Sequence, residues 1–186
     1  MSLRVSFELD ENDLKHFRLI MRDARKAAAG VAPEDIVAAA EDLLRVIGDT
    51  GAPAFVRERL DKLRLMIDML TDIDWRLPHQ EANRVLNALA YFAEPEALIP
   101  DSIPGLGFLD DAIMIELVVR ELRHEIEAYE DFRDFRARVR SESGRRAGVT
   151  REQWLENRRK ELHSRIRRRR KRGDGATSSK RLRLFR

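Results

Sequence analysis

The chain has 186 residues, of which 43% are hydrophobic and 37% charged, and its formal net charge is +3. This length allows one domain, or one domain and a tail. A domain of this size can bury a hydrophobic core that is stable without disulfide bonds or a structural metal. The absence of cysteine excludes disulfides, thiolate metal sites and cysteine nucleophiles, and it is typical of a reducing compartment. No secretory signal opens the chain, and no window approaches the roughly 20 apolar residues that span a bilayer. We therefore expect a cytoplasmic bacterial protein, with peripheral association at the inner face of the membrane as a second expectation.

The charge is distributed unevenly along the chain. Residues 1–143 carry 19 basic and 29 acidic side chains, a net of −10, whereas residues 144–186 carry 17 and 4, a net of +13. An acidic body followed by a basic tail indicates either a polyanionic partner or contact between tail and body.

The first half of the chain predicts three amphipathic helices. Asp10 has the chemistry of an N-cap, and an apolar stripe follows it as far as Gly30. A second helix is expected from Pro33 to Gly48, because proline at the first helical position loses no hydrogen bond. The same spacing predicts a third helix over residues 53–71.

The second half predicts more helix and no convincing strand. Residues 72–78 read as a connector, residues 85–94 as a short helix and residues 110–141 as the longest helix. Beyond a joint at 143–148, a helix is expected through about Arg172, but its apolar stripe looks too narrow to dock, so we predict an extension. The composition of residues 173–179 predicts disorder.

A stretch rich in proline and glycine joins the last two helices of the predicted bundle. Three prolines within ten residues remove amide donors and fix φ angles, which predicts a stiff loop closing a hairpin. Asp101 is expected to accept from loop amides, and Asp110 or Asp111 to cap the helix that follows. The positions that form this motif, in chain order, are Pro95, Leu98, Ile99, Pro100, Asp101, Ile103, Pro104, Gly107, Asp110 and Asp111.

These motif positions resemble the signature of the YkvA-like family (domain of unknown function 1232), over about residues 83–120. The resemblance implies the hairpin, but the family has no settled biochemical activity that could be carried over to this chain. Some members of the family are associated with membranes. The family usually carries an acid before its Leu-Ile-Pro-Asp run, where this chain has Ala97, so no role of that carboxylate is carried over.

No motif identifies an enzyme. Asp101, Asp110 and Asp111 have the oxygen ligands that Mg²⁺ or Ca²⁺ prefers, which leaves a metal-dependent enzyme as one alternative, although we favour capping. The four histidines lie far apart, and we interpret the His124-Glu125 pair as solvated. We predict no catalytic residue, no metal ligand and no cofactor.

The basic tail is the strongest electrostatic feature. Phosphates of nucleic acid would attract it through counterion release, and anionic lipid would attract it too, with Leu182, Leu184 and Phe185 able to insert. A solubilising tail, or one folded onto the acidic body, is the remaining interpretation. The candidate polyanion-binding residues are Arg165, Arg167, Arg168, Arg169, Arg170, Lys171, Arg172, Lys180, Arg181 and Arg183.

The sequence thus predicts an all-α protein with two parts. Residues 1–143 are expected to form an acidic bundle of five or six helices that includes the YkvA-like segment, and residues 144–186 a basic extension. The favoured function is that of a non-enzymatic binding or adaptor protein whose tail engages nucleic acid. Peripheral binding to an anionic membrane and metal-dependent catalysis are the alternatives.

Overall fold

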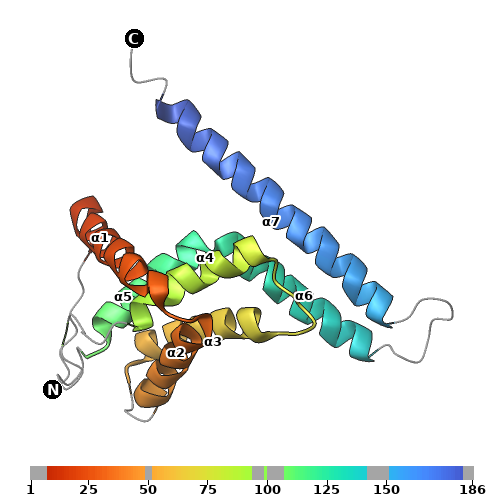
Figure 1. The fold of residues 1–186 in the computed structure, drawn as a ribbon, viewed down its shortest axis with the longest axis horizontal. Helices are drawn as coiled ribbons and strands as arrows, with labels where there is room; N and C mark the ends of the chain where they lie inside the picture. Colours follow the sequence, from red (N-terminus) through yellow and green to blue (C-terminus); the bar gives the residue numbers. More distant parts are fainter. Residues whose placement is uncertain (1–7, 49–51, 94–98, 100–106, 142–150, 182–186) are drawn as a thin grey trace. The chain divides into compact units, whose positions relative to one another are not determined.

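The structure is a computed structural model that describes residues 8–48, 52–93, 99, 107–141 and 151–181, with the backbone alone at 140, 141, 151 and 173–181. Every regular element in this part of the chain is a helix, which confirms the predicted all-α class (Figure 1). Six α-helices precede α7, in agreement with the expected five or six. The elements are α1 (Glu11–Ala27), η1 (Ala28–Gly30), α2 (Pro33–Gly48), α3 (Ala54–Thr71), α4 (His79–Leu89), η2 (Ala90–Ala93), α5 (Leu109–Glu121), α6 (Arg123–Ser141) and α7 (Arg151–Arg181).

Local chemistry sets the ends of the first helices where the sequence placed them. The Asp10 carboxylate accepts from the backbone N–H groups of Asn12 and Asp13 at 2.7 and 3.0 Å, while Asp13 accepts from the Asp10 N–H at 3.0 Å. This reciprocal pair satisfies amides that have no partner inside the helix. α2 begins at Pro33, as expected.

The predicted helix over residues 110–141 is instead two helices, α5 and α6, which meet at Leu122. The Leu122 side chain is fully buried, and neither proline nor glycine lies nearby, so nothing in the local sequence explains the break. α7, with 31 residues, is longer than either of them.

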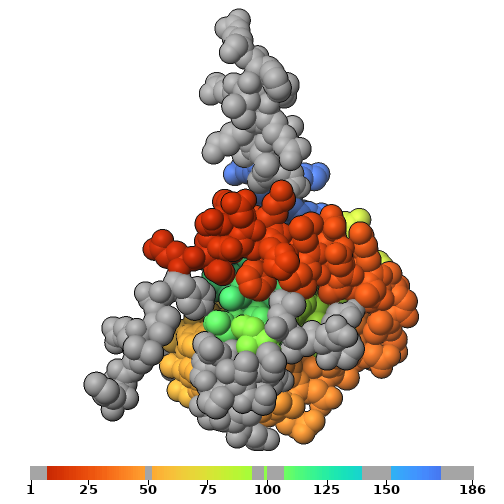
Figure 2. All heavy atoms as spheres, turned by 90° about the vertical axis from the view of Figure 1, so that its left-hand side faces the viewer, coloured from red at the N-terminus to blue at the C-terminus, as the bar shows by residue number. Residues whose placement is uncertain are grey.

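The chain divides into two compact units. Unit 1 comprises Met1–Arg64 and Leu86–Val118. In it, η2 packs against both α1 and α2, and the Arg25 guanidinium donates to the Asn87 carbonyl at 3.0 Å. Figure 2 views this unit from the side of α1, whose atoms border those near the start of α5. Its core includes Ala40, Ile47, Val56, Leu63, Leu89, Tyr91, Phe92, Met114 and Ile115.

Unit 2 comprises Leu65–Val85 and Val119–Arg186. α6 and α7 run antiparallel within it, since Arg165 pairs with Asp131 and Arg169, one turn further on, pairs with Glu127, one turn back (Figure 1). The core of this unit is built from Met66, Met69, Trp75, Val85, Leu122, Tyr129, Phe132, Leu155, Leu162 and Ile166.

α7 corrects two predictions about the C-terminal region. The helix docks on α6, and Leu162 and Ile166 are 0% and 1% exposed, so the prediction of an undocked extension is wrong. Its backbone stays helical through residues 173–179, where composition predicted disorder. The predicted boundary at residue 143 lies outside the described residues and stays a prediction, although the two units divide the chain elsewhere.

Candidate functional site

The family segment is described only in part. Ile99, Gly107, Asp110 and Asp111 belong to the described residues. The other motif positions lie outside them, namely Pro95, Leu98, Pro100, Asp101, Ile103 and Pro104. The role predicted for Asp101 therefore stays a prediction.

Asp110 does not lie at the N-cap position predicted for Asp110 or Asp111. α5 begins one residue earlier, at Leu109, after Phe108 with its positive φ of 65°, so Asp110 lies inside the first turn. Its side chain is 1% exposed and accepts from the Ile99 N–H at 3.1 Å and from the Tyr91 hydroxyl at 3.5 Å. Asp110 thus connects the loop to η2 and α5, which is the loop-stabilising role expected of Asp101.

The metal hypothesis gains no support from this segment. Within the described ranges, no three His, Cys, Asp or Glu side chains are grouped so that they could hold a metal ion. Asp111 is 9% exposed and, like Asp110, lies in the first turn of α5, where a carboxylate is favoured by the helix dipole.

Three of the ten candidate polyanion-binding residues already have acidic partners inside unit 2. Arg165 pairs with Asp131, and Arg169 pairs with Glu127. Arg170 lies 3.8 Å from the buried carboxylate of Glu81. The interpretation in which part of the tail contacts the acidic body therefore applies to these three arginines.

Four other candidates form what we call the α7 cationic face: Arg167, Arg168, Lys171 and Arg172. All four are exposed, and none is ion-paired to a carboxylate of the described residues. Arg167 donates to the Ser164 hydroxyl at 3.1 Å. The spacing i, i+1, i+4, i+5 places the four cations on one side of the helix. The side chains of Lys180 and Arg181, and the whole of Arg183, lie outside the described part.

The connector at 72–78 contains a polar network that the sequence did not reveal. The Asp72 carboxylate accepts from the Tyr129 hydroxyl at 2.9 Å, from Arg136 at 2.8 Å and from the N–H groups of Asp74 and Trp75 at 2.9 and 3.2 Å. Burial raises the pKa of Asp72, but the bonds from Arg136 and Tyr129 outweigh it and hold the pKa below its usual value. Burial and then the bond to Asp72 raise the pKa of Tyr129. With four donors on its carboxylate, Asp72 has a structural role.

Trp75 lies at the centre of an aromatic cluster. Its ring is fully buried against Tyr129, Phe132 and His163, with centroids 5.6, 5.1 and 4.4 Å away. Burial, followed by the positive charges of Arg159 and Arg167, lowers the pKa of His163 from 6.5 to about 4. The imidazole is therefore neutral near pH 7 and packs as an aromatic ring.

α7 also binds the connector through Arg159, which donates to the Asp74 carbonyl. Burial, followed by the charge of Arg76, lowers the pKa of Arg159, whereas Asp74 raises it. One further interpretation is wrong: Glu125, expected on a solvated face, is 1% exposed and lies 3.5 Å from Arg84.

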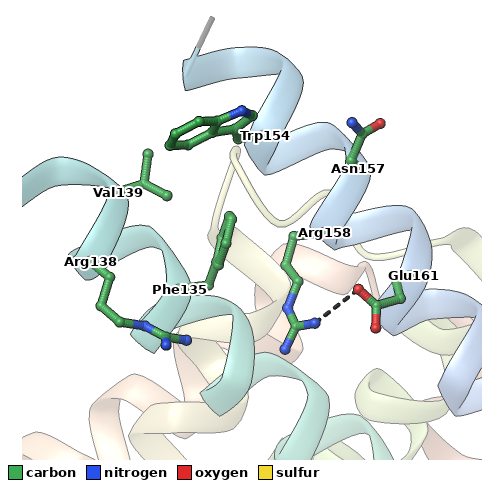
Figure 3. Close-up of a pocket in the computed structure, with 7 residues that line it drawn as sticks. All are labelled: Phe135, Arg138, Val139, Trp154, Asn157, Arg158 and Glu161. Atoms are coloured by element: carbon green, nitrogen blue, oxygen red, sulfur yellow. Dashed lines mark hydrogen bonds and ion pairs between the residues drawn. The ribbon is translucent and has the colours of Figure 1, made fainter. Parts of the chain in front are cut away.

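The described residues of unit 2 line hollows on its surface, and two of them are considered in turn. The first, the α6–α7 pocket, has a volume of about 420 Å³ and lies between the last turns of α6 and the first turns of α7 (Figure 3). Its lining residues are Phe135, Arg138, Val139, Trp154, Asn157, Arg158 and Glu161. The second, about 630 Å³, lies beside the connector and is lined by polar and charged side chains of both signs together with Leu155.

The sequence marks the residues that share one face of a helix, but it does not show which faces or segments meet in the fold. The spacing Trp154, Arg158, Glu161 on α7 and Phe135, Arg138, Val139 on α6 marks one face of each helix, but nothing in the sequence pairs the two faces. Likewise, the Asp-Ile-Asp-Trp run at 72–75 reads as a turn, and its partners on α6 lie more than fifty residues away.

Comparison with known proteins supports one assignment. The family described as protein of unknown function (DUF1232) matches residues 84–117. The "Uncharacterized membrane protein YkvA" of Bacillus subtilis (strain 168) is 29% identical over 99 residues, which cover 47% of this chain and 92% of that protein. No solved structure matches the chain. Among the helices of the described residues, none combines the length and the apolar character needed to cross a bilayer. The predicted resemblance is thereby confirmed: the chain carries a YkvA-like DUF1232 segment.

Proposed function

We propose that this chain is a non-enzymatic binding protein that engages a polyanion, with nucleic acid favoured, through the α7 cationic face. The observation that carries the proposal is the exposure of Arg167, Arg168, Lys171 and Arg172 on one side of a docked helix. The docking fixes these cations in position, so binding a phosphate backbone costs less side-chain and backbone ordering than it would for a loose tail. Phosphate contacts of this kind bind through release of condensed counterions.

The burial of the apolar residues of α7 favours nucleic acid over lipid. Leu155, Leu162 and Ile166 face the core of unit 2, so the described part of α7 has no apolar face to place in a bilayer. A membrane-surface helix binds through such a face together with its charges. The described part of α7 would therefore hold anionic lipid by charge alone, at about 1 kcal/mol per basic residue near the surface.

Peripheral membrane binding remains a second candidate because of one comparison. The Bacillus subtilis relative is named a membrane protein. The two candidates differ in a measurable way, since nucleic acid and anionic vesicles can be offered to the same protein.

The test uses substitutions in the full chain. Deletion of residues 144–186 would remove Leu162 and Ile166 from the core of unit 2, so a loss of binding would not be informative. The test variant carries Arg167→Gln, Arg168→Gln, Lys171→Gln and Arg172→Gln. The control carries Arg18→Gln, Arg22→Gln and Lys26→Gln, all on exposed positions of α1.

Binding of labelled duplex DNA, structured RNA and vesicles of anionic lipid is measured across a salt series. If all four cations contact phosphates, the slope of log K against log salt for duplex DNA becomes shallower by about 3.6 in the test variant. The control should keep the slope of the original chain. Unchanged nucleic-acid binding by the test variant would refute the proposal. If the original chain binds anionic vesicles and no nucleic acid, peripheral membrane binding replaces it as the function.

A further inference from the structure

The α6–α7 pocket is formed by two helical faces that meet within unit 2. α6 contributes Phe135, Arg138 and Val139 at i, i+3 and i+4, and α7 contributes Trp154, Asn157, Arg158 and Glu161 at i, i+3, i+4 and i+7. In Figure 3 the Trp154 ring extends toward Val139, and Phe135 lies beneath both of them. One wall is thus aromatic and apolar. The volume of the α6–α7 pocket, about 420 Å³, falls in the range of small-molecule sites.

The opposite part of the pocket is cationic. Arg158 is held by an ion pair of 2.8 Å with Glu161, and its guanidinium carbon lies 5.8 Å from the centre of the Phe135 ring. The Arg158 Nε–H is buried and meets no hydrogen-bond acceptor in the described part of the chain. Because this nitrogen has almost no accessible surface while the Arg158 side chain as a whole is 26% exposed, a ligand would meet the other atoms of the guanidinium. Arg138 supplies a second guanidinium on the α6 side.

We propose that the α6–α7 pocket binds a small aryl carboxylate. The aryl ring packs on Trp154, Phe135 and Val139, where aromatic faces stack favourably. The carboxylate accepts from the Arg158 guanidinium, whose planar set of donors matches two carboxylate oxygens. Glu161 accepts from Nη1 of Arg158, and Nη2 is the donor left for the ligand, because Nε has almost no accessible surface. This site shares no residue with the α7 cationic face, so the proposal does not depend on the polyanion.

The probe is phenylbutanoate, and its matched control ligand is phenylbutanol, which has the same ring and chain without the charge. Binding to the full chain is measured by titration calorimetry and by the fluorescence of Trp154, with Trp75 as a buried background. A ligand of this size that fits the pocket should bind with a dissociation constant of about 1 mM or tighter. The alcohol should bind at least about tenfold more weakly, because it cannot form the charged hydrogen bonds.

Three variants separate the pocket from the rest of the molecule. Arg158→Gln and, as an independent second variant, Arg138→Gln should each weaken phenylbutanoate binding, with about tenfold loss for Arg158→Gln. Lys160→Gln is the control, since this side chain is on the same helix and is 72% exposed. It should leave the affinity unchanged.

Any one of three results would overturn the proposal. These are no saturable binding up to about 10 mM, equal affinity for acid and alcohol, or unchanged affinity when Arg158→Gln and Arg138→Gln are combined. Thermal unfolding of each variant shows whether the substituted chain is folded, and if Arg158→Gln alone unfolds it, Arg138→Gln decides.

Discussion

The docking of α7 on α6 can be tested by removing one buried side chain, Leu162, which is 0% exposed. Complete burial of a leucine contributes about 1.5–3 kcal/mol by transfer from water. Because the cavity left by a Leu→Ala change adds to this, such substitutions in cores cost about 2.7–5 kcal/mol. We therefore expect Leu162→Ala to lower the free energy of unfolding of unit 2 by about 3 kcal/mol.

Urea unfolding followed by tryptophan fluorescence is suited to this measurement, since both tryptophans of the chain, Trp75 and Trp154, belong to unit 2. Lys160→Ala is the matched control, because this side chain lies half a turn away and is 72% exposed. Surface substitutions of that kind change stability by about 0.5 kcal/mol or less. A loss of that size for Leu162→Ala would mean that α7 is an undocked extension, and the packing argument would be refuted.

Three further predictions concern the polar groups. Tyr129→Phe, which removes a donor from Asp72, should cost about 1.5 kcal/mol in urea unfolding, and an unchanged midpoint would show that the bond is dispensable. Because His163 binds its proton near pH 4 when folded and near 6.5 when unfolded, the unfolded state holds more protons between these values. Stability should therefore fall as the pH drops from 6.5 to 4, by about 2 kcal/mol after allowance for solvent screening, and His163→Gln should flatten this part of the pH profile. Asp110→Ala, which leaves the Ile99 amide without its acceptor, should cost about 2 kcal/mol in thermal or urea unfolding followed by circular dichroism, and a neutral result would contradict the role of Asp110 in joining loop and helix.

The structure also changes how the charge asymmetry is understood. The basic C-terminal region is in part a component of unit 2, since Arg165, Arg169 and Arg170 pair with its carboxylates. The exposed cations that remain lie on a fixed helix. A polyanion would therefore meet an ordered array of charges.

The sequence by itself determined the features that depend on local physics. The cap at Asp10, the start at Pro33 and the end of α3 at Thr71 follow from side-chain chemistry and helical period, which act over a few residues. The all-α class follows for the same reason. The family segment could also be identified, because its ordered prolines, glycine and acids are contiguous in the chain.

Tertiary structure alone decided which of these elements meet. The stripe of α7 looked too narrow because its apolar residues are Trp154, Leu155, Leu162 and Ile166, but Arg159 and His163, each 8% exposed, widen the buried face. A charged side chain can enter a core when an acceptor across the interface takes its hydrogen bond, as the Asp74 carbonyl does for Arg159. A titratable ring such as His163 enters the core in its neutral form, because burial lowers its pKa. Such partners lie far away in sequence, and no local pattern can anticipate them. The hydrogen bond between Asp72 and Arg136 is a second example. The two residues lie far apart in the sequence, and only the packing of the connector against α6 brings their side chains together.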